Sequence, residues 1–513
     1  MLKRKQQGAA LILLVIAIVL TAVTFVVTNL SVNKSRETRH TNTANALAQA
    51  KEALISYAAT FHDTNAGGGA ARAGLMGFLP CPEILTSDPE GTSINSCEGE
   101  YISAIGRVPW KELGVPPLKD GSGSCLWYAV SSEYKNGGKG VLDPAALGLA
   151  LGPGYSRSEM LNDDSNGSFT LSDQNGNIIR GNTPEDRVVA IIIAPGAQLS
   201  GQNRANPVAN TQCGDDFNTA NFLETFNGVD NRSITTGTRH SIDGFITSGR
   251  VSNNALNDQI ITISQREIFD EIKRRSNFTQ IMSNTTQALA ECIAAYGKAS
   301  DTAYASGTAF RLPWPAAMDL NGGYAATLYY RDSQAYVEDP NIAPPIRGRF
   351  PVDVSASNTR TKNGFDQYLL EDTACSNLTL PAGSVDLTTN VTPNTNSVER
   401  RIWQNWKDHF FYVVGSGFAA DDLVSATANC PSINCITVDG KPFAAAVFFS
   451  GSRINNQIRT VPPNDPDTKS ILSNYLEADN INLDNIYETN MTNSNVNDIA
   501  FCISDDMTVS DCQ

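Results

Sequence analysis

The first long apolar stretch lies close to the N-terminus and is uninterrupted. No charged residue occurs from Ala9 through Val27, and Lys3, Arg4 and Lys5 precede this stretch. Nineteen helical residues span about 28 Å, which is close to the hydrocarbon thickness of a bilayer. A helix satisfies its backbone polar groups internally, as that environment requires. The pattern therefore predicts one membrane-spanning helix, and no second stretch of this kind follows.

The same helix is predicted to continue beyond the apolar stretch with one narrow apolar face. Apolar side chains recur at spacings of three and four residues, at Leu47, Ala50, Leu54, Tyr57 and Phe61. This spacing places them on one side of a helix. The glycine-rich segment at 65–74 ends the helix.

Several later segments have the short apolar runs that are typical of β-strands. The runs VVAIIIA (188–194) and AAAVFF (444–449) are short and rich in small, β-branched or aromatic residues, as buried central strands are. An Asn175-Gly176 pair between two short apolar stretches predicts a hairpin over 169–180. Ser264 and Glu267 form a capping box at the start of a second helix that runs to Tyr296. Helices followed by antiparallel strands predict an α+β fold.

The part of the chain after the first helix contains an internal sequence repeat. Six matched segments occur in the same order: ALISYAA (53–59) with CIAAYGK (292–298), LPCP (79–82) with LPWP (312–315), LWYAVSS (126–132) with FFYVVGS (410–416), 188–204 with 444–459, NFLE (221–224) with NYLE (474–477), and NDQIITIS (257–264) with NDIAFCIS (497–504). Matches in one order indicate a tandem duplication. Two similar domains, each a helix with an antiparallel sheet, are therefore expected.

Composition narrows the functional classes. The 513 residues carry a net charge of −15, so the chain is not expected to bind nucleic acid, which requires clustered Lys and Arg. The four histidines, His40, His62, His240 and His409, belong to no HExxH motif, and neither a GxSxG nor a Walker A sequence occurs. We therefore expect no enzyme and no organic cofactor.

Ten cysteines occur, at Cys81, Cys97, Cys125, Cys213, Cys292, Cys375, Cys430, Cys435, Cys502 and Cys512. None forms a CxxC pair, and no histidine lies at ligand spacing from any of them, so a cysteine zinc site is not predicted. An even number in an extracytoplasmic chain favours disulfides, with free buried thiols as the alternative. The short loops 81–97, 430–435 and 502–512 are the first candidates for pairs.

Two motifs admit a binding role. A Gly-x5-Gln-x-Arg element ends in Arg204 and again in Arg459. It follows a buried strand both times, so a structural role is favoured over an anion-binding one. The segment 162–173 carries oxygen side chains at spacings like those of an EF-hand loop and suggests calcium as the one metal. Its candidate ligands are Asn162, Asp164, Asn166 and Asp173.

Five tryptophans, at 110, 127, 314, 403 and 406, suit either a sugar-binding platform or, more commonly, the hydrophobic core.

The N-terminal sequence KRKQQGAALILLV resembles the class III leader of type IV pilins and pseudopilins. The resemblance covers about the first 60 residues. It implies that a prepilin peptidase cleaves between Gly8 and Ala9 and that the new N-terminus is methylated. Two positions depart from the family pattern: the first mature residue is Ala9 instead of Phe, and the fifth is Leu13 instead of Glu.

The resemblance implies a minor pilin or pseudopilin, anchored in a bacterial inner membrane by one span, with its head in the periplasm or on an extracellular filament. Its partners would be the peptidase, other pilin subunits and the inner membrane. The alternative is a single-pass extracytoplasmic binding protein or adhesin outside any filament. The expected parts are a leader (1–8), the transmembrane half of the first helix (9–29), an amphipathic helix with the first head domain (30–263), and a linking helix with the second (264–513).

Overall fold

A computed structural model describes most of the chain. The described residues are 6–61, 76–84, 89–93, 97, 102–135, 161–204, 211–235, 241–249, 255–301, 310–318, 342, 346–351, 402, 405–419, 429–431, 433–454, 457–459, 468–482, 484–489 and 495–512. Among residues 6–33, side chains are described only for 14 and 16–21.

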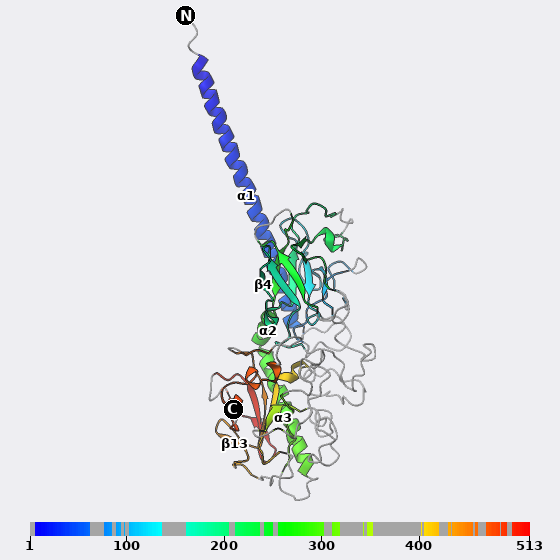
Figure 1. Ribbon diagram of the computed structural model, residues 1–513, viewed down its shortest axis with the longest axis vertical. Coiled ribbons are helices and arrows are strands. Elements are labelled where there is room, and N and C mark those ends of the chain that lie inside the picture. Colours follow the sequence, from blue (N-terminus) through cyan, green and yellow to red (C-terminus); the bar gives the residue numbers. More distant parts are fainter. Residues whose placement is uncertain are drawn as a thin grey trace.

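The fold is a mixed α+β arrangement in which a long N-terminal helix packs against a sheet. Helix α1 (Gln6–Thr60) projects far beyond the rest of the molecule (Figure 1). Its predicted apolar face is confirmed, because Leu47, Ala50 and Leu54 are buried, as is Phe61 just after the helix. Tyr57 is only half-buried. The tertiary structure thus holds the C-terminal part of α1.

The N-terminal part of α1 has a different character. Leu14, Ile16 and Ile18 are about half exposed, at 58%, 48% and 58%. Among the residues that the structure describes, no helix combines the length and the apolar character needed to cross a membrane. Most side chains of the predicted span 9–29 lie outside the described set.

The first half of the chain has a four-stranded antiparallel sheet beside α1. Its strands are β1 (Ala104–Arg107), β2 (Trp127–Val130), β5 (Ala190–Ala194) and β9 (Gln259–Ile263), in the order β1-β2-β5-β9. All neighbouring pairs are antiparallel. Strand β5 is fully buried and central, as the apolar run predicts.

A smaller sheet, β4-β3-β8, covers the other face of the first sheet. The strands β3 (Phe169–Asp173) and β4 (Ile178–Arg180) form the predicted hairpin, and Gly176 provides the positive φ of +85° in its turn. Strand β8 (Asp243–Thr247) pairs with β3 in parallel, which a purely antiparallel expectation missed. The strands β6 (Thr225–Phe226) and β7 (Val229–Asp230) form a further short pair.

The second predicted helix is interrupted. Helix α2 (Gln265–Arg274) begins with the predicted capping box of Ser264 and Glu267. Arg275 then adopts an extended conformation before α3 (Ser276–Asp301). The guanidinium of Arg275 donates to the carbonyl of Ala59 near the end of α1, a favourable position for a cation. A break at Arg275 lets α2 pack against α1 while α3 packs against the second sheet.

The second half repeats the order and direction of the first sheet and adds one strand. Its sheet, β10-β11-β14-β16-β17, is antiparallel throughout. The strands are β10 (Arg347–Arg349), β11 (Phe410–Val414), β14 (Ala445–Phe449), β16 (Ile499–Ile503) and β17 (Val509–Asp511). A small sheet, β13-β12-β15, covers one face. In it β12 (Ile436–Val438) pairs antiparallel with β13 (Lys441–Phe443) and parallel with β15 (Ile486–Tyr487).

Short 3-10 turns complete the described elements, at Pro184–Asp186, Thr219–Asn221, Lys407–His409, Thr468–Ser470, Leu472–Asn474 and Ala478–Ile481.

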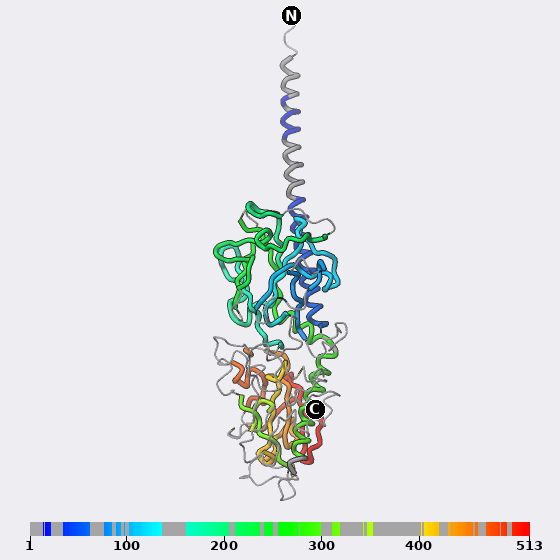
Figure 2. The backbone as a smooth tube through the Cα atoms, turned by 90° about the vertical axis from the view of Figure 1, so that its right-hand side faces the viewer, coloured from blue at the N-terminus to red at the C-terminus, as the bar shows by residue number. Residues whose placement is uncertain are grey.

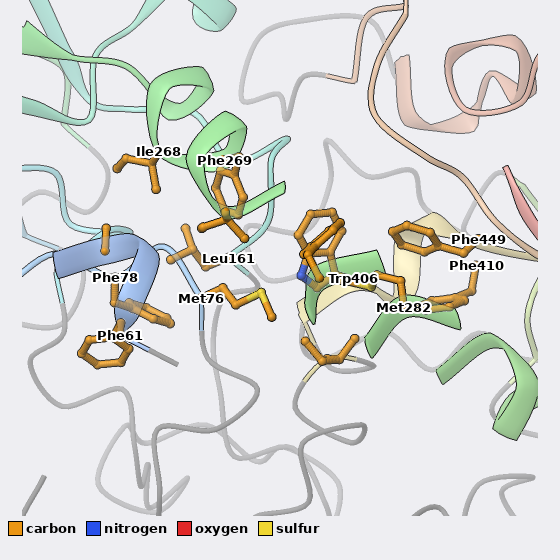
Figure 3. Packing of buried hydrophobic residues seen from close by; sticks show 14 of the residues in the cluster. Phe61, Met76, Phe78, Leu161, Ile268, Phe269, Met282, Trp406, Phe410 and Phe449 are labelled. Atoms are coloured by element: carbon orange, nitrogen blue, oxygen red, sulfur yellow. The ribbon is translucent and has the colours of Figure 1, made fainter. Parts of the chain in front are cut away.

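The two halves lie end to end along the long axis and share one core. In Figure 2 the blue-to-green half lies next to the projecting helix, and the half containing the C-terminus lies farther from it. Buried residues from both halves form one continuous cluster. Figure 3 shows its middle, where Phe269 of α2 lies between Leu161 and Trp406. The rings of Phe269 and Trp406 pack edge to face at 5.8 Å. The junction is therefore packed as a protein interior.

Candidate functional site

The Gly-x5-Gln-x-Arg element of the first half has a structural role. The Arg204 guanidinium donates to the carbonyls of Gly196 at 2.6 Å and Phe222 at 3.1 Å. It also donates to Oε1 of Gln202 at 2.9 Å. These donors bind the chain's own loop, so the element does not form the anion site that was the other interpretation.

The element of the second half has the same contacts. Arg459 is fully buried and donates to the carbonyls of Gly451 at 3.0 Å and Tyr475 at 3.2 Å. Oε1 of Gln457 accepts a further bond at 2.9 Å. The two arginines thus hold equivalent loops with equivalent partners.

Each half also contains a pair of buried carboxyl groups next to this loop. In the first half, Oε2 of Glu224 accepts from the backbone N–H of Asp258 at 3.0 Å, and Oδ2 of Asp258 accepts from Asn231 at 2.8 Å. Burial, and then the neighbouring Glu224, raise the pKa of Asp258 well above its ordinary value. The pair therefore favours a proton shared between Asp258 and Glu224, because ionising both of two close buried carboxyl groups is costly.

The second half places Glu477 and Asp498 in the same way. Oδ2 of Asp498 accepts from Asn480 at 3.0 Å. Burial and the charge of Glu477 raise the pKa of Asp498 well above its ordinary value. Neither pair was predicted from the sequence, although the aligned Asn-Asp dipeptides at 257–258 and 497–498 carried the signal.

The strongest candidate site is a charged cluster buried where the two halves meet. We call it the junction cluster; its members are Asp163, Asp164, Lys273, Asp408, His409 and Lys469. Both halves and α2 contribute to it. His409 and the three aspartate side chains are at most 6% exposed. A buried group of this kind is costly unless its charges are paired.

Hydrogen bonds of the 161–165 loop position Asp163 and Asp164 of the first half. Oδ1 of Asn162 accepts from the backbone N–H of Asp164 at 2.9 Å and shapes the turn. The amide of Asn162 donates to the carbonyl of Asn405 at 2.8 Å, and the backbone N–H of Leu161 donates to the Asn405 side chain at 3.0 Å. These bonds attach the 161–165 loop to the second half.

His409 lies at the centre of the cluster. Its Nδ1 is 2.8 Å from Oδ1 of Asp408. Its Nε2 is 3.2 Å from Oδ1 of Asp163 and 3.3 Å from Oδ2 of Asp164. Neither Nε2 nor Oδ1 of Asp163 makes a hydrogen bond of good geometry within the described part of the chain. Burial lowers the pKa of His409, but Asp408 and Asp164 outweigh it and raise the pKa to about 10.

The two lysines hold other carboxylate oxygens. Lys273 binds Oδ2 of Asp163 at 2.5 Å, and Lys469 binds Oδ2 of Asp408. Lys469 also lies 3.3 Å from Oδ2 of Asp164. Burial raises the pKa of Asp163, yet Lys273 and His409 bring it well below its ordinary value. Burial also raises the pKa of Asp164 and of Asp408, yet Lys469 and His409 bring both below their ordinary values.

The residues expected to bind calcium are divided between two places. Asn162 and Asp164 belong to the junction. Asp173 instead accepts from the backbone N–H groups of Asn175 and Asn177, at 2.8 and 2.9 Å, in the β3–β4 turn. Asn166 lies between them and is partly exposed. The predicted loop is thus divided because the hairpin uses its last position.

Two pockets flank α2 close to the junction cluster. One has a volume of about 330 Å³, and Asp163, Lys273 and Ser452 are among its lining residues. The other, of about 430 Å³, surrounds the start of α2. Arg453 lines both. Asp163 therefore connects the buried cluster with solvent.

The cysteines are paired in the described part of the chain. Disulfides join Cys81–Cys97, Cys125–Cys213, Cys430–Cys435 and Cys502–Cys512. Three of these close the short loops expected from the sequence. Cys292 is also disulfide-bonded, no free thiol occurs among the described residues, and Cys375 lies outside them.

The tryptophans mostly belong to the core. Trp127, Trp314 and Trp406 are buried, and Trp110 is partly buried. Trp403 lies outside the described residues. The structure offers no support for a sugar platform among those it describes.

Gly8 and Ala9 of the predicted cleavage site and Leu13 of the predicted assembly position lie within α1, and their side chains are outside the described set. Comparisons of the chain with protein-family models, curated proteins and solved structures found no match.

Proposed function

We propose that this chain is a minor pilin or pseudopilin that is anchored in a bacterial inner membrane and then incorporated into a filament. The observation that carries the proposal is α1. Its C-terminal part is packed against the head, while its N-terminal part extends beyond it with exposed Leu14, Ile16 and Ile18 (Figure 1). Such a helix suits a membrane before assembly and a bundle of other helices afterwards.

We further propose that the head consists of two tandem copies of one pilin-like domain. The corresponding strand orders support this, as do the paired arginine and carboxyl networks. At each of the aligned glycines, an asparagine side chain approaches the backbone so closely that no side chain would fit. A Cβ on Gly196 would lie 2.9 Å from the side chain of Asn257, and one on Gly451 would lie 2.2 Å from that of Asn497.

An extracytoplasmic location for the head is the third part of the proposal. Structural disulfides form and persist in oxidising compartments. Four disulfides are described, two in each half of the head. With one N-terminal anchor, the whole head would lie on the periplasmic side.

Leu13 favours a position at the filament tip. The family resemblance implies a Glu at this position in shaft subunits, where it pairs with the N-terminal amine of a preceding subunit. A carboxylate in an apolar environment is costly unless it is paired. A first subunit has no predecessor and needs no such group. A large head is also less constrained at an end than along a helical shaft.

Filament labelling tests the proposal. Antibodies against the head should label single ends of filaments sheared from cells that make the chain. A Gly8→Val variant, which should resist leader cleavage, should give unlabelled filaments and an intact membrane-bound chain. Labels along the whole shaft would refute the tip position. Absence of label from filaments, with the chain present in the membrane, would favour the single-pass binding protein.

A further inference from the structure

We propose that the junction cluster binds one divalent transition-metal ion of the zinc class, through Oδ1 of Asp163, Oδ2 of Asp164 and Nε2 of His409. One ligand atom from each of these three residues lies within 4.8 Å of the other two. The inference does not depend on the filament role.

The spacing of the donors fits a tetrahedral ion. Zinc binds imidazole nitrogen and carboxylate oxygen at about 2.0–2.2 Å, so two ligands of one tetrahedral ion lie about 3.3–3.5 Å apart. Nε2 of His409 is 3.2 Å from Oδ1 of Asp163 and 3.3 Å from Oδ2 of Asp164. These separations lie at the long end of the hydrogen-bond range, neither Nε2 of His409 nor Oδ1 of Asp163 makes a hydrogen bond of good geometry in the described part of the chain, and the separations match two edges of a coordination tetrahedron.

The groups around the donors are those that orient metal ligands. A metal-binding imidazole commonly donates its other N–H to a carboxylate. Asp408 provides this acceptor, with Oδ1 at 2.8 Å from Nδ1 of His409. Lys273 binds Oδ2 of Asp163 and leaves Oδ1 without a hydrogen-bond partner in the described part of the chain.

The position of the site gives the ion access from solvent and lets it stabilise the junction of the two halves. Asp163 lines the pocket of about 330 Å³, through which an ion reaches the donors. Because two ligands come from the 161–165 loop and the third immediately precedes β11, the ion would join the two halves. It should stabilise the folded chain by mass action.

The test uses the full-length, detergent-solubilised chain and cobalt(II) as a spectroscopic probe. Titration with Co²⁺ should give the intense visible absorption of a tetrahedral ion at about one equivalent, and Zn²⁺ should abolish it. His409→Gln and Asp163→Asn should each weaken cobalt binding by about tenfold or more. His40→Gln, the same substitution on α1, should bind like the wild type.

Elemental analysis of the protein purified without chelator should agree, with about one zinc per chain. The wild-type result does not depend on whether a variant folds. If folded wild-type chain gives no tetrahedral cobalt spectrum and retains no zinc after loading and dialysis, the cluster binds no metal and the proposal is wrong. Equal binding by wild type and a folded His409→Gln variant would also overturn it.

Discussion

Replacing Asp258 by Asn should alter how the stability of the protein depends on pH. Asp258 is completely buried, and its pKa is raised well above the ordinary value by burial and by Glu224. The folded protein thus binds this proton more tightly than the unfolded chain does. Its contribution to stability is greatest at low pH and decreases as pH rises toward the folded pKa.

The magnitude follows from proton linkage. Wherever native Asp258 keeps its proton and the unfolded chain has lost it, this group lowers the free energy of unfolding by about 1.4 kcal/mol per pH unit. An amide at position 258 is neutral at every pH and retains a donor toward Glu224. The Asp258→Asn variant should therefore gain stability relative to the wild type, by about this amount per unit, as pH rises above about 4.

Guanidinium unfolding of the full-length chain in detergent, with disulfides intact, measures this difference between about pH 5 and 7. Asp270→Asn, an exposed substitution on α2, provides the control and should leave the slope unchanged. Asp498→Asn should reproduce the effect in the second half. Parallel curves for the wild type and Asp258→Asn would show that the carboxyl pair does not hold a proton.

Three further outcomes follow from the described contacts. Arg459→Met should lower the free energy of unfolding by about 3 kcal/mol or more, because it leaves several buried acceptors without a hydrogen bond. Arg204 is only half-buried, so Arg204→Met should lower the free energy of unfolding by less in the same denaturation assay. Loss of the disulfide by Cys125→Ser with Cys213→Ser should cost about 2–5 kcal/mol, and thiol labelling of denatured, unreduced wild type should find almost no free thiol. Gly176→Ala should lower the midpoint of thermal unfolding, at a cost of about 1–2 kcal/mol for a positive φ.

Local pattern predicted the elements whose formation depends on local chemistry. The apolar spacing predicted the buried face of α1, the apolar runs predicted β5 and β14, and the capping box predicted the start of α2. The break at Arg275 was not predictable in this way. It depends on a contact with the carbonyl of Ala59, which is 216 positions distant.

The junction cluster illustrates the same limit. Asp163 and His409 lie far apart in the sequence, and only the packing of the two halves brings them together. The predicted calcium loop is divided in the structure for a related reason. Its last residue, Asp173, had a stronger local use in the hairpin turn. The matched segments were detectable because their order along the sequence does not depend on tertiary contacts.

The mass of the mature N-terminus tests the central claim most directly. The chain should be extracted from membranes of its host, and its N-terminal peptide analysed by mass spectrometry. The account predicts a peptide that begins at Ala9, one methyl group heavier than the unmodified sequence, and its loss in cells without the prepilin peptidase. A chain that begins at Met1, or one cleaved near residue 28, would contradict the assignment as a pilin or pseudopilin.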